Sequence, residues 1–542
     1  MDLHALPLEA QVAQLFMVGY SGASPNLITR RFIEHGLGGL IFFRDNFDEL
    51  PRQTPQAVWD LLQDLQNTVP ATYPKLLMGI DQEGGQVERL PHTVFPTGLS
   101  PRAIALAPDA DRLAKTHYEA MAQRLVSLGF NLDFFPTLDV NFQHRNPIIG
   151  VRSFGDAPET VWRFAQLAWE AFETAGLIAV GKHFPGHGNG TVDSHLDLPT
   201  LHFTSEELQP FQQAIQAGLP AMLVAHGYYP ALQTTEAERK LPSSASPAVI
   251  QTLLRQKCGF DGVVITDDLC MGAITKHRSP VEAAIASLKA GVDILLYKQS
   301  TEAEWEVYQA VVQAFKSGDL PLSLLEQSMT RIAKLKARYI KPTQPLEQKQ
   351  WQANALTAEA DSMAESAISV LSGDPNCLPA TENARLLVIH PDRSCMGNYA
   401  FDAPTSPDLA ALVRQAGAQD LFDLTYLPRE AFSAAELLKQ LPESVFDGQP
   451  PDLLLFVAFN ALLQNSQVEL YELLKARLPN TTIVLASAGT PYDHEAIPGP
   501  TLHLGLCSYR PATMRALVKA LKAGLPNNAL FKTDCAVGGA NY

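Results

Sequence analysis

Paired cysteines are missing from this 542-residue chain, which has six scattered cysteines and no Cys-x-x-Cys motif. This distribution fits reduced thiols better than a disulfide framework or a cysteine-based zinc site. No apolar run reaches membrane-spanning length, and the segment Met1–Pro7 has neither the basic nor the apolar region of a signal peptide. We therefore expect a cytoplasmic protein that has no membrane partner.

Positive charge is also scarce. The chain has 41 Lys and Arg residues against 57 Asp and Glu residues, which gives a formal net charge of −16 at pH 7. The phosphates of nucleic acids and anionic lipids repel such a protein, so neither is an expected partner. Hydrophobic residues make up 46% of the sequence, as in ordinary globular proteins. The chain is too long for one typical core, so we expect at least two domains.

The first part of the chain alternates short apolar runs with longer amphipathic stretches. We expect the apolar runs to be strands, and they cover residues 14–20, 38–44, 76–81, 130–136, 178–183, 221–226, 262–267 and 292–298. The amphipathic stretches predict helices, for example over residues 109–128, 158–176, 205–218 and 247–259. Such alternation is typical of a parallel sheet, and eight units predict a (β/α)8 barrel of the TIM type over residues 1–340. A doubly wound open sheet is the main alternative.

A helix over residues 320–340 would complete this region. The prolines at 342 and 345 interrupt it, so we place a linker at residues 341–352. A helical pattern over residues 355–370 then leads into a smaller α/β domain, residues 353–542. Its expected strands cover residues 385–390, 453–459, 482–488 and 501–506. This second domain has no cluster of ionisable groups comparable to those of the first.

Polar residues collect at the carboxyl ends of the predicted barrel strands. They are Asp81, Asp139, Lys182, His183, His226 and Asp267. Barrel enzymes carry their active sites at this end of the barrel, so the distribution favours an enzyme. Each residue alone could instead cap the helix that follows it.

The densest group of ionisable side chains spans residues 182–195 and follows directly on a buried strand. It contains Lys182, three histidines and one aspartate. Catalytic residues are often found on loops that a rigid strand anchors. In Asp193-x-His195, the carboxylate can fix the tautomer of the imidazole and raise its basicity, which makes a proton-transfer unit. The alternative is a plain turn with polar side chains.

Two adjacent acids, Asp267 and Asp268, end a strand rich in β-branched residues. Neighbouring residues on a strand point to opposite faces, so one acid can enter a pocket while the other pairs with the scaffold. The alternative is a pair of solvated or helix-capping acids.

Two further segments carry candidate binding groups. Asp81 stands at a strand end before a Gly-Gly turn, where its carboxylate could hold two hydroxyls of a polyol. A phosphate cradle is a weaker alternative because the nearby acids would repel phosphate, and a plain turn is a third. Arg152 lies in an apolar loop over residues 146–155, either as a sugar-binding group or in a scaffold ion pair.

Together these segments make the chain resemble family 3 of the glycoside hydrolases, in its bacterial β-N-acetylglucosaminidase branch. The motifs occur in the family's order: Asp81-Gln82-Glu83-Gly84-Gly85, Asn146-Pro147-x-Ile149-Gly150-x-Arg152-Ser153-Phe154, Lys182-His183-Phe184-Pro185-Gly186-His187-Gly188, Asp193-Ser194-His195-x-x-Leu198-Pro199 and Thr266-Asp267-Asp268-Leu269-x-Met271. The resemblance implies a TIM-type barrel followed by a smaller α/β sandwich domain. We expect no metal and no other cofactor.

The resemblance also implies residue roles. Asp267 would be the nucleophile, His195 the general acid/base and Asp193 the partner of His195. The sugar would be bound by Asp81, Arg89, Arg152, Lys182 and His183. The chain departs from the family at Gln86, where Arg is usual, and at Asn189, where Asp is usual. These departures concern the fine substrate contacts and the conformation of the loop.

The implied chemistry is that of a retaining glycosidase. Such enzymes use two carboxyl groups roughly 5–5.5 Å apart, one as nucleophile and one as acid/base. Here an imidazole would replace the second carboxyl group, and its usual pKa of about 6.5 suits proton transfer near neutral pH. A histidine is neutral after the first step, so phosphate could also approach the glycosyl-enzyme. A β-N-acetylglucosaminide phosphorylase is therefore the first alternative.

Two other classes are considered. A metal-dependent barrel hydrolase could use His183, His187, His195, His226 and Asp267 as zinc ligands, although Pro185-Gly186 prevents a helical pair of histidines. A non-catalytic sugar-binding protein is the other.

We expect instead an exo-acting enzyme that hydrolyses terminal non-reducing β-linked N-acetylglucosamine from a small carbohydrate. The resemblance implies muropeptide fragments from peptidoglycan recycling as its source. The sequence leaves the aglycone and the oligomeric state open.

Overall fold

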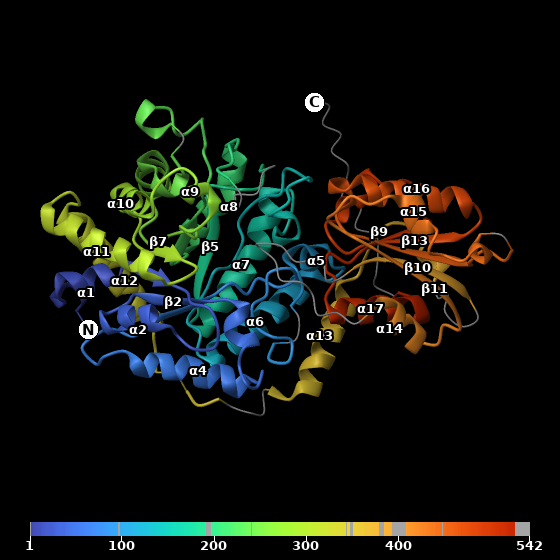
Figure 1. Ribbon diagram of the computed structural model, residues 1–542, viewed down its shortest axis with the longest axis horizontal. Coiled ribbons are helices and arrows are strands. Elements are labelled where there is room, and N and C mark those ends of the chain that lie inside the picture. Colours follow the sequence, from blue (N-terminus) through green and yellow to red (C-terminus); the bar gives the residue numbers. More distant parts are fainter. Residues whose placement is uncertain are drawn as a thin grey trace.

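Eight parallel strands form the first domain of the computed structural model, which describes residues 2–95, 98–190, 197–239, 241–342, 344–346, 351–378, 384–392, 408–446 and 448–525 (Figure 1). The strands are β1 (Phe16–Val18), β2 (Gly39–Phe42), β3 (Leu77–Ile80), β4 (Leu132–Asp133), β5 (Ile178–Phe184), β6 (Ala221–Val224), β7 (Val263–Thr266) and β8 (Leu295–Tyr297). They run in the order β7-β6-β5-β4-β3-β2-β1-β8. A parallel bridge between Ile265 and Ile294 brings β7 beside β8, so the sheet nearly closes on itself. The predicted barrel is confirmed, and the doubly wound open sheet is wrong.

Helices surround this barrel. They are α1 (Leu8–Ala13), α2 (Leu27–Glu34), α3 (Arg44–Asp48), α4 (Pro55–Thr68), α5 (Pro101–Leu106), α6 (Ala110–Leu128), α7 (Pro158–Ala175), α8 (Ser205–Ala217), the π-helix η5 (Ala248–Lys257), α9 (Gly272–Thr275), α10 (Pro280–Ala290), α11 (Glu302–Ser317) and α12 (Leu322–Tyr339). Local signals set their ends. In α10, Ser279 and Glu282 form a reciprocal capping box, and Gly291 ends the helix in the left-handed conformation. No helix in the described ranges is both long and apolar enough to cross a bilayer.

The barrel strands are fully buried, which explains their continuous apolar sequences. All seven residues of β5 are buried, including Lys182 and His183 near its carboxyl end. Parallel strands covered by helices need apolar side chains on both faces, so the apolar runs of the sequence locate these strands well. The polar residues that follow them then meet at one end of the barrel.

The second domain contains a six-stranded mixed sheet with helices on both faces (Figure 1). Its strands are β9 (Ser369–Gly373), β10 (Arg385–Pro391), β11 (Asp420–Tyr426), β12 (Leu453–Ala458), β13 (Thr482–Ser487) and β14 (Leu502–Gly505), in the order β11-β10-β12-β13-β14-β9. One face packs against α14 (Leu409–Gln415) and α17 (Pro511–Ala523), and the other against α15 (Ala434–Leu438) and α16 (Asn465–Arg477). The predicted α/β sandwich is confirmed.

Two edge strands of this sheet were not predicted. The strand β9 pairs antiparallel with β14, and it begins at Ser369, inside the helix expected over residues 355–370. The strand β11 has mostly half-buried or exposed side chains at the opposite edge. Edge strands pack on fewer neighbours and need less apolar sequence, so neither has the pattern of a buried strand.

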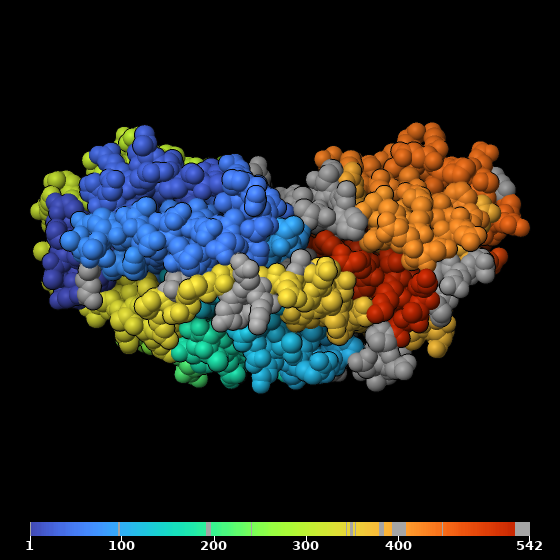
Figure 2. Space-filling view, turned by 90° about the horizontal axis from the view of Figure 1, so that it is seen from below, coloured from blue at the N-terminus to red at the C-terminus, as the bar shows by residue number. Residues whose placement is uncertain are grey.

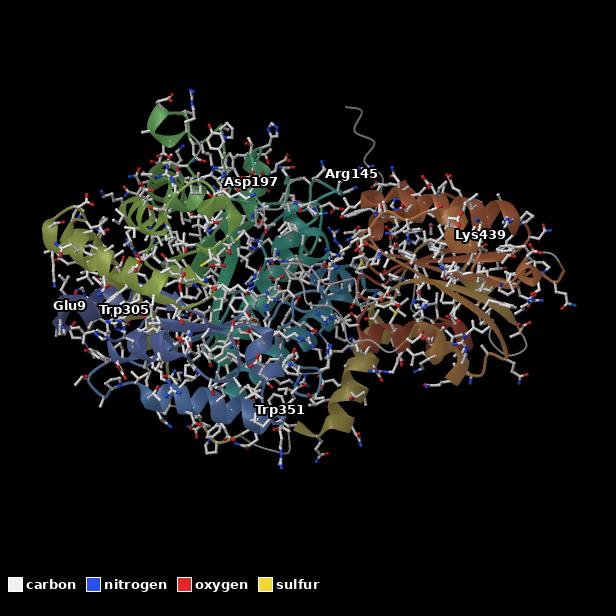
Figure 3. All side chains as sticks on the ribbon, viewed as in Figure 1. Glu9, Arg145, Asp197, Trp305, Trp351 and Lys439 are labelled. Atoms are coloured by element: carbon white, nitrogen blue, oxygen red, sulfur yellow. The ribbon has the colours of Figure 1, made fainter. Side chains whose placement is uncertain are left out.

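The two domains lie side by side and are joined through α13 (Ala353–Ala367). This helix packs against both α6 of the barrel and α17 of the second domain, and Figure 2 shows it in yellow next to the red α17. The predicted linker, residues 341–352, falls between α12 and α13. Figure 3 shows Arg145 at the boundary between the domains, where its Nη1 donates to the carbonyl of Leu462 at 2.6 Å. The second domain therefore contacts the loops at one end of the barrel directly.

Short 3-10 turns connect several of these elements. They are η1 (Leu3–Ala5), η2 (Gly150–Arg152), η3 (Glu236–Glu238), η4 (Ser243–Ala245), η7 (Pro375–Cys377), η9 (Glu443–Val445), η10 (Ala461–Leu463) and η11 (Pro491–Glu495). Three of them lie near the domain boundary. The turn η2 carries Arg152, η10 carries Leu462, and η11 carries Tyr492, which contacts the loop that leads to η2.

Candidate active site

A cavity of about 720 Å³ opens at the carboxyl ends of the barrel strands. Its polar walls include all six of the predicted site residues that the structure describes: Asp81, Arg89, Arg152, Lys182, His183 and Asp267. Apolar side chains line the rest, among them Phe43, Phe134, Ile148, Leu223, Met271 and Leu296. The predicted Asp193 and His195 lie outside the described residues. Polar groups that converge within partly apolar walls are typical of a pocket for a small polar ligand.

Glu83 is the buried centre of the polar wall, with no exposed surface. Its two carboxylate oxygens accept from Nη2 and Nε of Arg152 at 2.7 and 2.9 Å, and Nζ of Lys182 lies 2.5 Å from Oε1. Burial by itself raises the pKa of this carboxyl group, but the two cations hold it well below its usual range. Glu83 is therefore ionised, and it fixes both cations at the cavity wall.

Asp81 presents a second carboxylate beside this cluster. Its Oδ1 accepts from Nζ of Lys182 at 2.7 Å, and its Oδ2 lies 3.8 Å from Nη2 of Arg89. Burial by itself lowers the pKa of Lys182, but the carboxylates of Asp81 and Glu83 raise it above its usual value. Lys182 is thus charged, and Asp81 and Arg89 offer an acceptor and a donor side by side to a ligand hydroxyl.

His183 is held in one tautomer by its two partners. Its Nδ1 lies 2.6 Å from Oδ2 of Asp139, and its Nε2 lies 3.1 Å from Nη2 of Arg152. A guanidinium only donates, so Nε2 accepts and the ring proton is on Nδ1, pointing at Asp139. Burial would raise the pKa of Asp139, but His183 and His187 lower it below its usual value. Asp139 therefore orients the imidazole as an ionised acceptor.

The two adjacent acids after β7 have different surroundings. Asp267 is half-buried at the cavity, and its Oδ1 accepts the backbone N–H of Asp268 at 2.8 Å. Asp268 also touches the cavity, but its Oδ1 accepts the backbone N–H groups of Cys270 and Lys298 at 3.0 and 2.9 Å. Burial raises the pKa of the Asp268 carboxyl above its usual value. Asp268 thus pairs with the scaffold, and both acids line the cavity.

The described part of the loop after β5 is fixed at its base. The backbone N–H of His187 donates to Asp139 at 2.7 Å, and the carbonyl of His187 accepts from Asn146 at 2.8 Å. A Cβ at Gly188 would collide with the carbonyl of Val140, so this close approach requires glycine. The hydroxyl of Tyr229 donates to the carbonyl of Gly186 at 2.6 Å. These contacts determine where the chain leaves the cavity at Gly190, just before residues 191–196, which lie outside the described residues.

The candidate zinc ligands are not brought together in the described part of the chain. Within those residues, no three His, Cys, Asp or Glu side chains gather as a metal site would require. Nδ1 of His226 bonds the hydroxyl of Ser244 and its Nε2 bonds the carbonyl of Asp268, so this ring supports the β7 turn. His187 lines the cavity, and burial lowers its pKa to about 4, so it is neutral at pH 7.

Sequence reasoning missed two residues of this site. The sequence shows Glu83 only as part of a motif. Side chains two residues apart on an extended chain point the same way, so the spacing of Glu83 from Asp81 could have indicated that both carboxylates face the site. Asp139 was noted as a polar residue near a strand end, but its role depends on contact with β5, which the sequence does not show. The sequence leaves Arg152 open between a sugar-binding role and a scaffold ion pair. The structure shows the ion pair with Glu83, and Arg152 also lines the cavity.

Residues 7–335 match the Glycosyl hydrolase family 3 N terminal domain. A beta-hexosaminidase A from Pseudoalteromonas piscicida is 34% identical over 337 residues, which are 58% of this chain and 55% of that protein. The chain therefore matches little more than half the length of this relative. A beta-hexosaminidase from Thiobacillus denitrificans is also 34% identical, over 51% of this chain and 76% of its own.

A solved structure resembles both domains. It is a glycoside hydrolase family 3 beta-N-acetylglucosaminidase from Paenibacillus sp. strain FPU-7, with 31% identity and a TM-score of 0.82. The comparison covers 96% of this chain and 98% of that one.

Two buried aspartates, Asp139 and Asp133, should respond differently to replacement by asparagine. We expect Asp139→Asn to lower the free energy of unfolding at pH 7 by about 1.5–3 kcal/mol, because it removes a charged acceptor of hydrogen bonds. The pKa of Asp139 is lowered in the folded protein, so this stability is present above its unfolded pKa and is lost as pH falls through the folded one. The difference between wild type and Asp139→Asn in urea titrations should therefore shrink towards acid pH.

Asp133→Asn is the matched control. Burial raises the pKa of Asp133 well above its usual value, which favours the neutral side chain, and its Oδ1 accepts the N–H of Gln82 as an amide oxygen would. We expect no loss of stability at pH 7. Equal losses of unfolding free energy in the two variants would contradict the view that Asp139 is charged and Asp133 is not.

Proposed function

The chain belongs to family 3 of the glycosyl hydrolases, and on that basis we propose that it hydrolyses terminal, non-reducing β-linked N-acetylglucosamine with retention of configuration. The observation that carries the proposal is the placement of Asp267 in one cavity with the polar cluster of Asp81, Arg89, Arg152, Lys182 and His183. The names of the relatives, beta-hexosaminidase and beta-N-acetylglucosaminidase, support the substrate.

The polar cluster suits a pyranose ring. A sugar presents several hydroxyls that both donate and accept, and the wall offers the Asp81 carboxylate next to the donors of Lys182 and Arg89. Glu83 holds Lys182, which in turn pairs with Asp81, so little conformational freedom of these two side chains is lost when a sugar binds. The sugar would lie with its anomeric carbon towards Asp267, while apolar side chains such as Met271 cover its C–H faces.

Asp267 is proposed as the nucleophile and His195 as the acid/base. In the first step Asp267 attacks the anomeric carbon, and His195 protonates the leaving oxygen as the glycosidic bond breaks. In the second step His195 takes a proton from water, which attacks and releases the sugar and Asp267. Asp193 would stabilise the imidazolium of His195. The roles of Asp193 and His195 rest on the family resemblance alone, since both lie outside the described residues.

The substrate is proposed to come from peptidoglycan, as a muropeptide fragment met in the cytoplasm. This source and this location rest on the resemblance and on the composition of the sequence. Selectivity for the 2-acetamido sugar over glucose is part of the same proposal. A site that pairs with a polar group of its substrate rejects the analogue that lacks it, because buried groups are then left unpaired.

Water rather than phosphate is proposed as the final acceptor. A glycine-rich phosphate site needs free backbone N–H groups, but those of Gly84 and Gly85 donate to the carbonyls of Val87 and Gly98. The carboxylates of Asp81, Asp267 and Asp268 also line the cavity, and they weaken the attraction of its cations for a phosphate dianion. Water is abundant and meets no such barrier.

Replacing the two adjacent acids tests the nucleophile. With an aryl β-N-acetylglucosaminide, Asp267→Asn should lose on the order of 10³-fold or more in kcat, because the covalent intermediate cannot form. Asp268→Asn keeps an acceptor oxygen for the N–H groups of Cys270 and Lys298, and it should keep most of the activity. Near-normal turnover by folded Asp267→Asn would reject this assignment.

Phosphate dependence separates hydrolysis from phosphorolysis. Turnover of aryl β-glycosides, measured with and without millimolar phosphate, should be nearly unchanged, and free N-acetylglucosamine should be the product. The β-glucoside of the same aglycone should be a much poorer substrate. If N-acetylglucosamine 1-phosphate dominates and the rate climbs with phosphate, the protein is a phosphorylase.

A further inference from the structure

The second domain reaches the cluster of sugar-binding residues through two contacts. At the first, Arg510 at the start of α17 binds the turn between Glu83 and Arg89. At the second, the hydroxyl of Tyr492 lies 3.3 Å from Nδ2 of Asn141 and bonds the carboxylate of Asp156, on the two sides of the loop that carries Arg152. No sequence motif connects these residues of the second domain with the site.

The turn that Arg510 holds determines the position of two site residues. The N–H of Glu83 and the N–H of Gly84 both donate to the carbonyl of Val87. The N–H of Arg89 donates to Oε1 of Gln82 at 3.0 Å, which ties the end of the turn back to its start. Any displacement of this turn therefore moves Glu83 and Arg89 together.

The turn is packed closely on its inner side. Gly84 and Gly85 have positive φ angles of 92° and 62°. A Cβ at Gly84 would lie 2.2 Å from the carbonyl oxygen of Leu99, and one at Gly85 would lie 2.5 Å from Cβ of Ser100. The hydroxyl of Ser100 in turn donates to the carbonyl of Cys507 in the second domain at 2.8 Å. The turn thus lies between the barrel and the second domain.

Arg510 supplies the polar contacts on the outer side, and it is only 2% exposed. Its Nε donates to the carbonyl of Gly85 at 2.6 Å, and its Nη2 lies 3.4 Å from the carbonyl of Gln86. Burial and the charge of Arg510 lower the pKa of His92 to about 3, so this ring is neutral and can accept from Nη1 of Arg510 at 3.5 Å. One planar guanidinium therefore contacts three acceptors across the domain boundary.

A buried carboxylate completes this contact. Oε2 of Glu88 lies 3.6 Å from Nε of Arg510, and Glu88 is 1% exposed. Its Oε1 accepts the N–H of Gly98 at 2.5 Å, and the carbonyl of Gly98 accepts the N–H of Gly85. Buried charges need partners, so Glu88 and Arg510 hold each other in place as well as the turn. A lysine could supply the charge but not the flat array of donors.

We propose that Arg510 is a positioning residue for the sugar site, through which the second domain sets the location of Glu83 and Arg89. The substrate in this inference comes from the proposed function, whereas the effect of Arg510 on the position of the turn does not depend on that function. Misplacing a binding group by about 1 Å can reduce a rate by about 10²-fold, so the effect on catalysis is measurable. Arg510 is not among the residues that line the cavity, and it acts through the turn.

The test compares Arg510→Gln and Arg510→Lys with Arg515→Gln. Arg515 is on the same helix and pairs with Asp361 of α13 at 2.6 Å, away from the turn. We expect Arg510→Gln to lower kcat/KM for an aryl β-N-acetylglucosaminide about 10- to 100-fold, with a matching loss of affinity for free N-acetylglucosamine. Arg510→Lys should fall between this variant and wild type, and Arg515→Gln should stay within about twofold of wild type. The loss should be the same for good and poor leaving groups.

Hydrogen exchange of the peptide that covers residues 82–90 gives a readout without substrate. It should be faster in Arg510→Gln than in Arg515→Gln or wild type. Folded Arg510 variants with wild-type exchange and kcat/KM within twofold of wild type would overturn the proposal. If wild type does not turn over the β-N-acetylglucosaminide, the proposed function fails, and the exchange difference alone still decides the role of Arg510.

Discussion

The carboxylate of Glu83 is the constraint on which the rest of the site depends. It has no exposed surface, and it joins the guanidinium of Arg152 to the ammonium of Lys182. Without it, two buried cations would face each other with Asp81 as their main counter-charge, which is costly in a poorly solvated interior. Because the turn after β3, the strand β5 and the loop that carries Arg152 each supply one member, this ion cluster forms only when these parts of the barrel come together.

This arrangement explains how the site can bind an uncharged sugar strongly enough to orient it. The cations of the wall share fixed carboxylates, so the wall presents directed donors and acceptors to a ligand. His183 extends the same network to Asp139 and to the base of the loop after β5. Arg510 and Tyr492 extend it outwards to the second domain. The second domain is thus in contact with the loops that hold the proposed sugar-binding residues.

Much of the fold could be predicted from the sequence, because buried parallel strands need continuous apolar runs, as in residues 178–183. The edge strands β9 and β11 could not, since few of their side chains are buried. At the site, acids and bases directly after strands were found, because strand ends meet at one end of a barrel. Arg510 could not be found, because its partner Gly85 is 425 residues away and no local pattern connects them.

Trapping the covalent intermediate tests the account most directly. The account predicts that a mechanism-based fluorinated analogue of β-N-acetylglucosaminide adds one glycosyl group to the intact protein. Peptide mass spectrometry should then locate that group on Asp267, the first of the two acids that follow β7. Labelling of Asp268, or turnover of the analogue with no covalent species under conditions that trap other retaining enzymes, would contradict it.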